Sequence, residues 1–272
     1  MSALEAILLG LVQGLTEFLP ISSSGHLRVV PAFLGEEDPG AAFTAVIQLG
    51  TMAAVLVYFR NDLWAIATAW LRELRAPWSE RSHESRLGWF IVLGTIPIAI
   101  FGLAFSEQIE SGARDLYLIG SALILFSLVM LAAEWLGQRT RDLTAIDGRD
   151  AGFIGFAQAL ALIPGVSRSG ATISAGLLRG FDRAAAARYS FLLSVPAVVL
   201  SGLFELRQIG GEGDNASAAA TVIATAAAFV SGYAAIAWLL RYLASHTLGI
   251  FIAYRIPLGI AVIVLTATGT IS

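Results

Sequence analysis

The chain has 272 residues, of which 57% are hydrophobic and 14% are charged, and its mean hydropathy is +0.75. An average soluble domain has about 25% charged residues, so this composition excludes an ordinary soluble protein and predicts a polytopic integral membrane protein. The net charge of −3 gives no basis for a nucleic-acid partner, and the absence of cysteine excludes disulfides and thiolate metal sites.

The N-terminal apolar segment, residues 3–34, lacks the basic residues that open a cleavable signal peptide, so we expect it to remain in the mature protein. It is interrupted at Leu19–Gly25 (LPISSSG), and a second apolar segment, 151–178, is interrupted at Ile163–Gly170 (IPGVSRSG). Pro, Gly and successive Ser residues end a helix, and each arm is too short to cross about 30 Å of hydrocarbon. Both segments are therefore predicted to be re-entrant hairpins.

The remaining apolar runs approach the length of about 20 residues that spans a bilayer. We predict an all-α membrane protein with six transmembrane helices in addition to the two hairpins. The connection 60–87 is rich in Trp and Arg and is predicted to hold an amphipathic helix on the membrane surface. The six predicted spans are 42–59, 88–105, 116–136, 189–206, 218–240 and 249–270.

The two interruptions resemble each other in sequence. The Ser-Ser-Ser-Gly run 22–25 corresponds to Ser-Arg-Ser-Gly at 167–170, each preceded by a proline, and residues 41–51 align with 186–196 at the same offset. Each hairpin is followed by three predicted spans. The chain therefore divides into two similar halves, 1–140 and 141–272, within one membrane domain.

Arginine is unevenly distributed among the connections, and this distribution sets the orientation of a membrane protein. It is concentrated in 60–87, 137–150 and 179–188, whereas 35–41, 106–115 and 207–217 carry at most one arginine each. Placing the arginine-rich group in the cytoplasm puts both termini outside, and the two hairpins then enter from opposite sides. This arrangement is an inverted-topology repeat, whose two interruptions meet near the midplane.

Three ionisable residues lie at the interruptions: Glu17, His26 and Arg168. An ionisable residue inside the membrane indicates a functional site. Gln13 lies four residues before Glu17, so the two side chains share one helical face. Arg255, which follows Tyr254 in the last span, is interpreted as part of a structural ion pair or a lipid contact.

A serine-rich turn at the start of a half-helix can bind an anion through its backbone N–H groups and hydroxyls. The planar fork of Arg168 matches phosphate oxygens, and Glu17 and His26 are candidates for base, acid or nucleophile. Phosphoryl transfer uses this combination of groups, often with a divalent metal. Such serine and glycine clusters can also be simple turns, but two related interruptions that meet at one place favour a functional site.

The stretches Gln13–Leu27 (QGLTEFLPISSSGHL) and Leu162–Ile173 (LIPGVSRSGATI) closely resemble the bacterial undecaprenyl-diphosphate phosphatases of the bacitracin-resistance type. The resemblance continues through 46–51 (VIQLGT), 146–149 (IDGR) and 190–196 (SFLLSVP), and so covers nearly the whole chain. It implies hydrolysis of a polyprenyl diphosphate lipid, undecaprenyl diphosphate, to the monophosphate carrier of cell-wall (peptidoglycan) synthesis. It also implies a bacterial plasma-membrane location, an active site open to the outer face and a divalent cation, Mg²⁺ or Ca²⁺.

The resemblance also implies roles for individual residues. The family's metal-binding element falls on Gln13 and Glu17, and its arginine falls on Arg168. Ser23 is the predicted nucleophile, activated by His26 or Glu17, with attack by water or by His26 itself as alternatives. Thr44 and Ala45 stand where the family often has an acidic residue, so a third carboxylate is not expected. The predicted phosphate-binding residues are Ser22, Ser24, Ser167, Arg168 and Ser169.

Two alternatives belong to other classes. Lipid phosphatases of the phosphatidic-acid type place a nucleophilic His six residues after a Ser-Arg pair, and here that position is Ser174. Inverted repeats with broken helices are also typical of secondary transporters, so a transporter or lipid flippase is the non-enzymatic alternative. The sequence leaves the oligomeric state open, including a homodimer.

Overall fold

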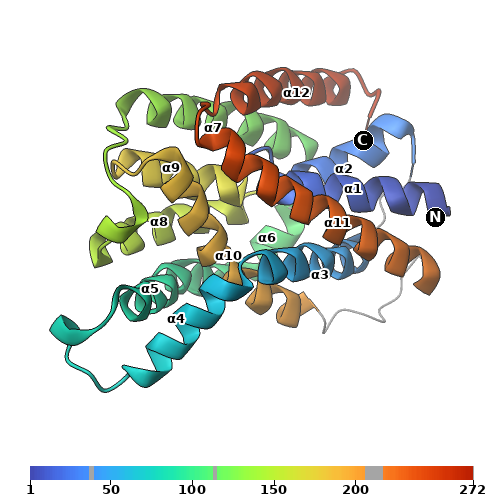
Figure 1. Cartoon of the computed structure of the whole chain (residues 1–272). Coiled ribbons are helices and arrows are strands. Elements are labelled where there is room, and N and C mark those ends of the chain that lie inside the picture. The colour runs from blue at the N-terminus through green and yellow to red at the C-terminus, as the bar shows by residue number, and fades with distance from the viewer. Residues whose placement is uncertain (37–39, 113–114, 206–216, 272) are drawn as a thin grey trace.

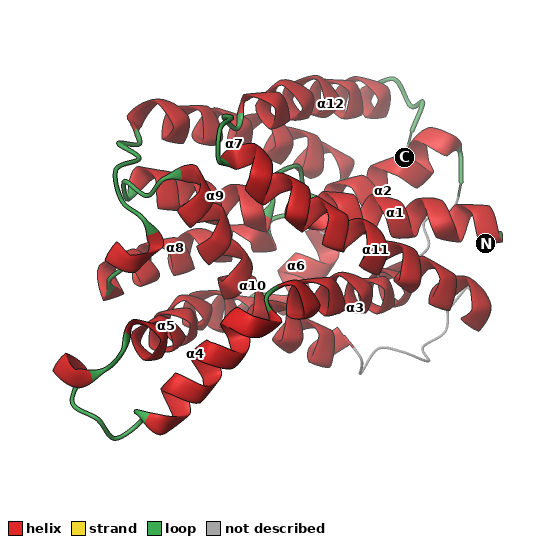
Figure 2. Ribbon diagram, in the orientation of Figure 1, coloured by secondary structure: helices red, strands yellow, loops and turns green. Residues whose placement is uncertain are grey.

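The computed structural model describes residues 1–36, 40–112, 115–205 and 217–271, and these residues are almost entirely helical (Figure 2). Within them, β-structure is limited to an isolated bridge between Arg141 and Phe181, so the predicted all-α fold is confirmed. Three short 3-10 helices lie at Trp78–Glu80, Leu143–Ala145 and Leu160–Leu162. The α-helices are α1 (Ala3–Phe18), α2 (Ser23–Leu34), α3 (Gly40–Tyr58), α4 (Arg60–Arg72), α5 (His83–Ala104), α6 (Ser106–Gly112), α7 (Leu116–Leu136), α8 (Gly148–Ala159), α9 (Arg168–Leu178), α10 (Arg183–Glu205), α11 (Ala218–Leu243) and α12 (Gly249–Ala267).

Among the described residues, five helices are long and apolar enough to cross a membrane: α5, α7, residues 183–200 of α10, α11 and α12. A sixth crossing results only if residues 43–58 of α3 and the whole of α4 count as one bent span. These two helices meet at a bend of 74°. The chain is therefore a multi-pass membrane protein with five or six spans, and the predicted number of six depends on this bent pair.

Beyond the bend, α4 occupies the connection that was predicted to hold a surface helix. Trp64 is 74% exposed on one side of α4, whereas Ile66 is buried on the other. Trp70 packs against Trp89 of α5 with ring centroids 5.3 Å apart. The helix is thus amphipathic, as the sequence indicated.

Two helices begin before the apolar spans that the sequence predicted, α5 at His83 and α10 at Arg183. Hydropathy detects only the apolar part of a helix, whereas a capping residue can extend it by a turn or more. Ser82 accepts a hydrogen bond from Ser85 N at 3.3 Å, and Asp182 accepts one from Ala185 N at 2.7 Å. The predicted connection 179–188 is consequently helical over its second half.

Some residues of the predicted outer connections lie outside the described part of the chain. These residues are Glu37, Asp38, Arg114, Arg207 and the remainder of 207–216.

Each predicted hairpin is a pair of helices separated by an interruption, α1 with α2 and α8 with α9. In Figure 1 the N-terminus and α2 lie toward the right end of the molecule, whereas α8 and α9 lie toward the left end with the α4–α5 connection. Both hairpins begin with a capping box, Ser2 with Glu5 in α1 and Asp147 with Asp150 in α8. A capping box satisfies N–H groups that the first helical turn leaves without partners.

The hairpins pack against helices from the opposite part of the chain: α1 against α11, and α8 against α5. Both crossings are close because glycine faces the partner helix. A Cβ at Gly10 would lie 2.2 Å from the Ala224 carbonyl oxygen, and one at Gly155 would lie 2.6 Å from Gly94 Cα. Small residues permit this approach of two backbones inside a membrane.

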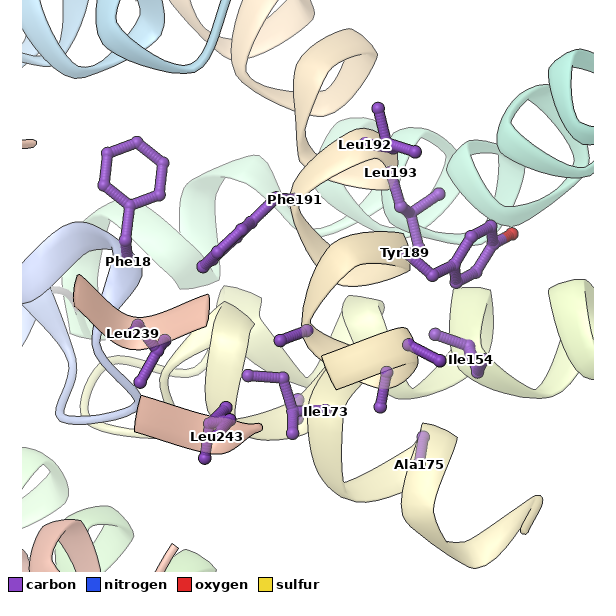
Figure 3. Packing of buried hydrophobic residues seen from close by; sticks show 14 of the residues in the cluster. Phe18, Ile154, Ile173, Ala175, Tyr189, Phe191, Leu192, Leu193, Leu239 and Leu243 are labelled. Atoms are coloured by element: carbon purple, nitrogen blue, oxygen red, sulfur yellow. The ribbon is translucent and has the colours of Figure 1, made fainter. Parts of the chain in front are cut away.

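The main core lies between the two hairpins and is shown in Figure 3. Phe18 at the end of α1 meets Phe191 of α10 edge-on, with ring centroids 5.5 Å apart. Leu239 of α11 and Ile173 of α9 are fully buried in the same cluster. Aromatic packing next to Glu17 therefore fixes the end of α1, where the first interruption begins.

Asp150 joins the start of α8 to the end of α9. Its buried carboxylate accepts hydrogen bonds from Arg141 Nη2 and Arg179 Nε, both at 2.6 Å. Burial alone would raise the pKa of Asp150, but the hydrogen bonds from the two arginines outweigh it, so the pKa lies below its ordinary value. The ion pairs thus hold the two ends of the second hairpin together.

Candidate active site

The two serine-rich interruptions have the same local geometry. Ser22 precedes α2 with φ 76°, and Ser167 precedes α9 with φ 75°. Each accepts a hydrogen bond from a glycine N–H in the first helical turn, Gly25 and Gly170 respectively. A non-glycine residue with positive φ is strained, and such strain concentrates at functional sites. The helix starts of α2 and α9 therefore form a matched pair of potential anion sites.

Arg255 of α12 contacts both interruptions, and its side chain is fully buried. It donates from Nη1 to the Pro20 carbonyl at 3.3 Å and from Nη2 to the Gly165 and Val166 carbonyls at 2.9 and 3.2 Å. Its Nε donates to Ser127 Oγ of α7 at 3.0 Å. One side chain thus satisfies backbone groups that both interruptions leave without helical partners.

The interpretation of Arg255 as part of an ion pair or a lipid contact was wrong. Among the described residues no carboxylate pairs with it, and complete burial excludes lipid. Its partners are carbonyl oxygens, which a sequence does not reveal.

Glu17, in the last turn of α1, is the centre of the polar cluster. Its Oε2 accepts a hydrogen bond from Ser23 Oγ at 2.5 Å, and its Oε1 forms an ion pair with Arg168 Nη2. Arg168 also donates from Nη1 to the Ser194 carbonyl of α10 at 3.3 Å. The structure therefore brings the predicted nucleophile, carboxylate and arginine into direct contact across both interruptions.

Gln13 lies behind Glu17, one helical turn earlier, and is fully buried. Its Nε2 donates to Glu17 Oε2 at 3.2 Å and to Thr51 Oγ1 of α3 at 3.4 Å. Its Oε1 is buried and has no hydrogen-bond partner among the described residues. A buried oxygen without a partner next to a carboxylate is a suitable ligand for a hard cation.

The described residues contain no group of three or more His, Cys, Asp or Glu side chains that could enclose a metal. Mg²⁺ typically takes one or two carboxylates and completes its shell with water and substrate phosphates. Gln13 Oε1 and the Glu17 carboxylate fit this partial donor set. They do not fit a closed metal cage.

His26 is buried, and both of its ring nitrogens are occupied. Nδ1 lies 2.7 Å from the Ser22 carbonyl oxygen, so it carries the proton and donates, and Nε2 accepts from the Tyr254 hydroxyl at 2.7 Å. The His26 and Tyr254 rings also stack, with centroids 5.6 Å apart. His26 makes no hydrogen bond to Ser23 among these contacts, so its geometry fits a residue that positions the first interruption.

The remaining predicted phosphate-binding serines line the same two turns. Ser22 and Ser24 hydroxyls lie 3.3 Å apart, and Ser167 and Ser169 hydroxyls lie 3.2 Å apart. Ser169 also donates to the Leu19 carbonyl at 3.1 Å, which ties the second turn to the first. Ser24 is exposed and Ser23 is partly exposed, so the polar cluster is accessible at the start of α2.

The sequence did not predict roles for Tyr254, Thr51, Thr172 or Ser190. The hydroxyls of Thr172 and Ser190 lie 2.5 Å apart. Thr51 lies in the VIQLGT stretch, which was noted for the resemblance alone. Arg255 could have been found, because a charged residue inside a predicted span indicates function by default.

An apolar cavity of about 760 Å³ begins at the second interruption. Leu162, Ile163 and Pro164 line it together with Phe101 and Phe105 at the end of α5. The cavity therefore adjoins the turn that carries Arg168 and contains almost no polar surface.

The fold and the polar cluster define a class of protein. This is a multi-pass membrane protein whose interrupted helices hold a serine, a carboxylate and an arginine in one buried, partly accessible site. Residues 6–261 match the family model described as bacitracin resistance protein BacA. The chain belongs to this family.

Curated bacterial relatives are similar over their full lengths. A protein of Nocardioides sp. is 54% identical over 270 residues, covering 99% of this chain and 98% of the relative. One of Mycolicibacterium smegmatis is 52% identical over 275 residues, covering 100% and 99%. One of Thermobifida fusca is 50% identical over 272 residues, covering 100% and 93%. All three are named undecaprenyl-diphosphatase.

Proposed function

We propose that the chain is an undecaprenyl-diphosphatase, which hydrolyses undecaprenyl diphosphate to undecaprenyl phosphate and inorganic phosphate. The observation that carries the proposal is the contact of Glu17 with both Ser23 and Arg168. This contact joins a nucleophile, a base and a phosphate-binding cation, the groups that phosphoryl transfer requires.

In the first step, Ser23 Oγ attacks the terminal phosphorus while its proton passes to Glu17. The bond from that phosphorus to the bridging oxygen breaks, and undecaprenyl phosphate leaves with the bridging oxygen. Arg168 and the N–H groups at the starts of α2 and α9 stabilise the charge that develops on the phosphoryl oxygens.

Before the second step, Glu17 releases its proton to solvent. Water then attacks the phosphorus on Ser23 while Glu17 accepts a proton from the water. The bond from phosphorus to Ser23 Oγ breaks, Glu17 returns this proton to Ser23 Oγ, and inorganic phosphate departs. Direct attack by water, with Glu17 as base, is the alternative that uses the same residues. Attack by His26 is disfavoured, because both of its ring nitrogens are committed to Ser22 and Tyr254.

A divalent cation, Mg²⁺ or Ca²⁺, is part of the proposal. Gln13 Oε1 and the Glu17 carboxylate would hold it, and when bound it would neutralise charge on the diphosphate. Gln13 also orients Glu17 through its Nε2 hydrogen bond, a role that does not depend on the cation.

The polyprenyl tail is assigned to the apolar cavity between α5 and α8, because Ile163 and Pro164, which begin the interruption before Arg168, line that cavity. A pocket of 300–1,000 Å³ with apolar walls is typical of a ligand site. Phe156, 62% exposed on this wall, is the residue to test. Phe156→Ala should raise KM for the C55 substrate more than for a C15 diphosphate, whereas Leu125→Ala, also outward-facing but away from the cavity, should not.

We further propose that the two hairpins are re-entrant and that the halves 1–140 and 141–272 form an inverted repeat. The support is the matched geometry at Ser22 and Ser167, the capping box at the start of each hairpin, and the reciprocal packing of α1 on α11 and α8 on α5. The arginine-rich connections would then face the cytoplasm of a bacterium, and the active site would open to the outer face of the plasma membrane. In that location the enzyme would recycle the lipid carrier of peptidoglycan synthesis and contribute to bacitracin resistance.

The test is release of phosphate from undecaprenyl diphosphate by purified protein in detergent, with and without a chelator. Hydrolysis that the chelator abolishes supports both the reaction and the cation. A secondary transporter or flippase, the alternative from another class, needs two compartments and would leave the diphosphate intact. Intact substrate after prolonged incubation of monodisperse protein would therefore overturn the proposal.

A further inference from the structure

A second cavity, of about 350 Å³, is lined by charged and apolar residues, and none of them belongs to the serine-rich turns. It is enclosed by the last turn of α7, the start of α10 and the turn between α11 and α12. In Figure 1 the end of α7 and the start of α12 lie toward the left, the end that also holds the α4–α5 connection. The residues of the proposed hydrolysis do not line it.

The polar wall of this cavity contains two arginines and one carboxylate. Glu134 accepts hydrogen bonds from Arg183 Nε at 2.9 Å and Nη2 at 2.7 Å, from Arg139 Nη1 at 3.2 Å and from Leu248 N at 2.9 Å. The carboxylate is thus saturated with donors and neutralises only one of the two guanidinium groups. The cavity keeps a net charge of +1 from these side chains.

Several guanidinium N–H groups remain available. Nη1 of Arg183, and Nε and Nη2 of Arg139, have no hydrogen-bond partner among the described residues. The Thr247 hydroxyl also lines the cavity. Convergent guanidinium N–H groups and a hydroxyl match the oxygens of a phosphate group.

The remaining side chains that line the cavity are apolar. Leu131, Ile252 and Trp135 line the cavity, and Trp135 is 77% exposed. Tryptophan is enriched where a transmembrane helix reaches the membrane surface. Basic pockets between transmembrane helices at such a level bind the head groups of anionic lipids.

We propose that this cavity binds the phosphate of an anionic phospholipid, with the acyl chains running along Leu131 and Trp135 into the bilayer. Glu134 holds the two guanidiniums apart and oriented, and the lipid phosphate completes their hydrogen bonding and neutralises the remaining charge. The bound lipid adds a link among α7, α10 and the α11–α12 turn, which Glu134 already joins through Arg183 and Leu248. The site is separate from the hydrolysis and does not depend on it.

The test compares lipid binding by the full chain in detergent, with dioctanoyl phosphatidylglycerol and dioctanoyl phosphatidylcholine as probes. Binding is measured by native mass spectrometry and by the rise in unfolding temperature. Arg139→Gln is the main variant, because Arg139 is 35% exposed and makes a single hydrogen bond. Arg149→Gln is its matched control, since Arg149 is exposed in the first turn of α8 and lies outside the cavity.

We expect phosphatidylglycerol to bind and stabilise the wild type, and Arg139→Gln to bind it about fivefold or more weakly. Arg139→Lys should bind with intermediate affinity, because it keeps the charge and loses the fork. Arg149→Gln should match the wild type. Each variant should retain the wild-type rate of diphosphate hydrolysis, which keeps this test independent of the proposed reaction.

Three results would overturn the proposal. The first is equal binding of phosphatidylglycerol and phosphatidylcholine, and the second is equal weakening in Arg139→Gln and Arg149→Gln, which would indicate diffuse attraction. The third is competition by millimolar inorganic phosphate with the same loss in Arg139→Gln, which would identify a site for a soluble anion in place of a lipid.

Discussion

Replacing Arg255 should separate the two interruptions that it connects. Arg255→Met removes four hydrogen bonds and leaves the carbonyls of Pro20, Gly165 and Val166 without their donor in a buried region. A buried polar group left unsatisfied costs about 1–3 kcal/mol, so the three carbonyls together cost roughly 3–9 kcal/mol. Typical stabilities are about 5–15 kcal/mol, and the variant should therefore be severely destabilised.

A milder variant separates the effect of Arg255 on the alignment of the two turns from its effect on the stability of the fold. Arg255→Lys keeps the charge, but an ammonium group concentrates its three donors on one atom and cannot reach Pro20 and Gly165 together. We expect it to fold with a lowered unfolding temperature and to lose about 10²-fold in kcat, comparable to the loss of one oxyanion donor. Phosphate release and thermal unfolding of monodisperse protein in detergent measure the two effects. Arg241→Met, at an exposed position on α11, is the control and should change neither.

Wild-type unfolding temperature and kcat in Arg255→Met would refute this reasoning. That result would mean that water or another side chain satisfies the three carbonyls, and that the serine-rich turns keep their geometry through Ser169 and its contact with Leu19.

Three further outcomes are expected. Glu17→Gln removes the base from Ser23, and Arg168→Lys removes the planar fork. Each variant should fold and should lower kcat by about 10²- to 10³-fold. Near-native turnover in either variant would show that the replaced residue does not act in catalysis. Asp150→Asn should lower the unfolding temperature at pH 7. Because the folded pKa of Asp150 is lowered, its stabilisation is present above the ordinary value of 3.8 and is lost as the pH falls through the folded value. The variant should therefore converge with the wild type in acid, and a constant difference would contradict this origin. Single cysteines at Glu36 and Ser79 test orientation, since an impermeant maleimide applied to intact cells should label only the first; the reverse pattern would overturn the proposed topology.

The sequence could predict the helix interruptions of the candidate site because their signals are local. Pro20 and Pro164 with their serine runs interrupt apolar segments, and the structure ends a helix and starts another at each of them. Glu17 and Arg168 were singled out because charge is costly inside a membrane, and they prove to be in contact. The division into two halves stays a prediction.

The choice between Glu17 and His26 as the base could not be made from sequence. Glu17 and His26 lie six and three residues from Ser23, and either distance permits contact across a turn. In the structure Ser22 has a positive φ, the Ser23 hydroxyl donates to Glu17, and His26 contacts the Ser22 carbonyl and Tyr254. These contacts, which depend on tertiary structure, are the reason that the proposed reaction uses Glu17 as the base.

Arg255 was missed for a different physical reason. Its partners lie 235 and about 90 residues away in the chain and are backbone carbonyls, which every residue possesses. Only the assembled structure shows that these carbonyls lack helical partners. A buried arginine in a predicted span can therefore be recognised from sequence as important, but its role as a brace between two turns depends on tertiary structure.

The reciprocal packing of the hairpins explains why the site needs such a brace. α1 lies on α11 and α8 lies on α5, so each hairpin is supported mainly by a helix from the other part of the chain. A shift of one hairpin would separate Ser23 and Glu17, which belong to the first, from Arg168, which belongs to the second. Loss of about 1 Å of alignment between reacting groups can cost 10²-fold in rate. The contacts that cross between the hairpins, from Arg168 to Glu17 and from Arg255 to both turns, therefore maintain the alignment on which the proposed chemistry depends.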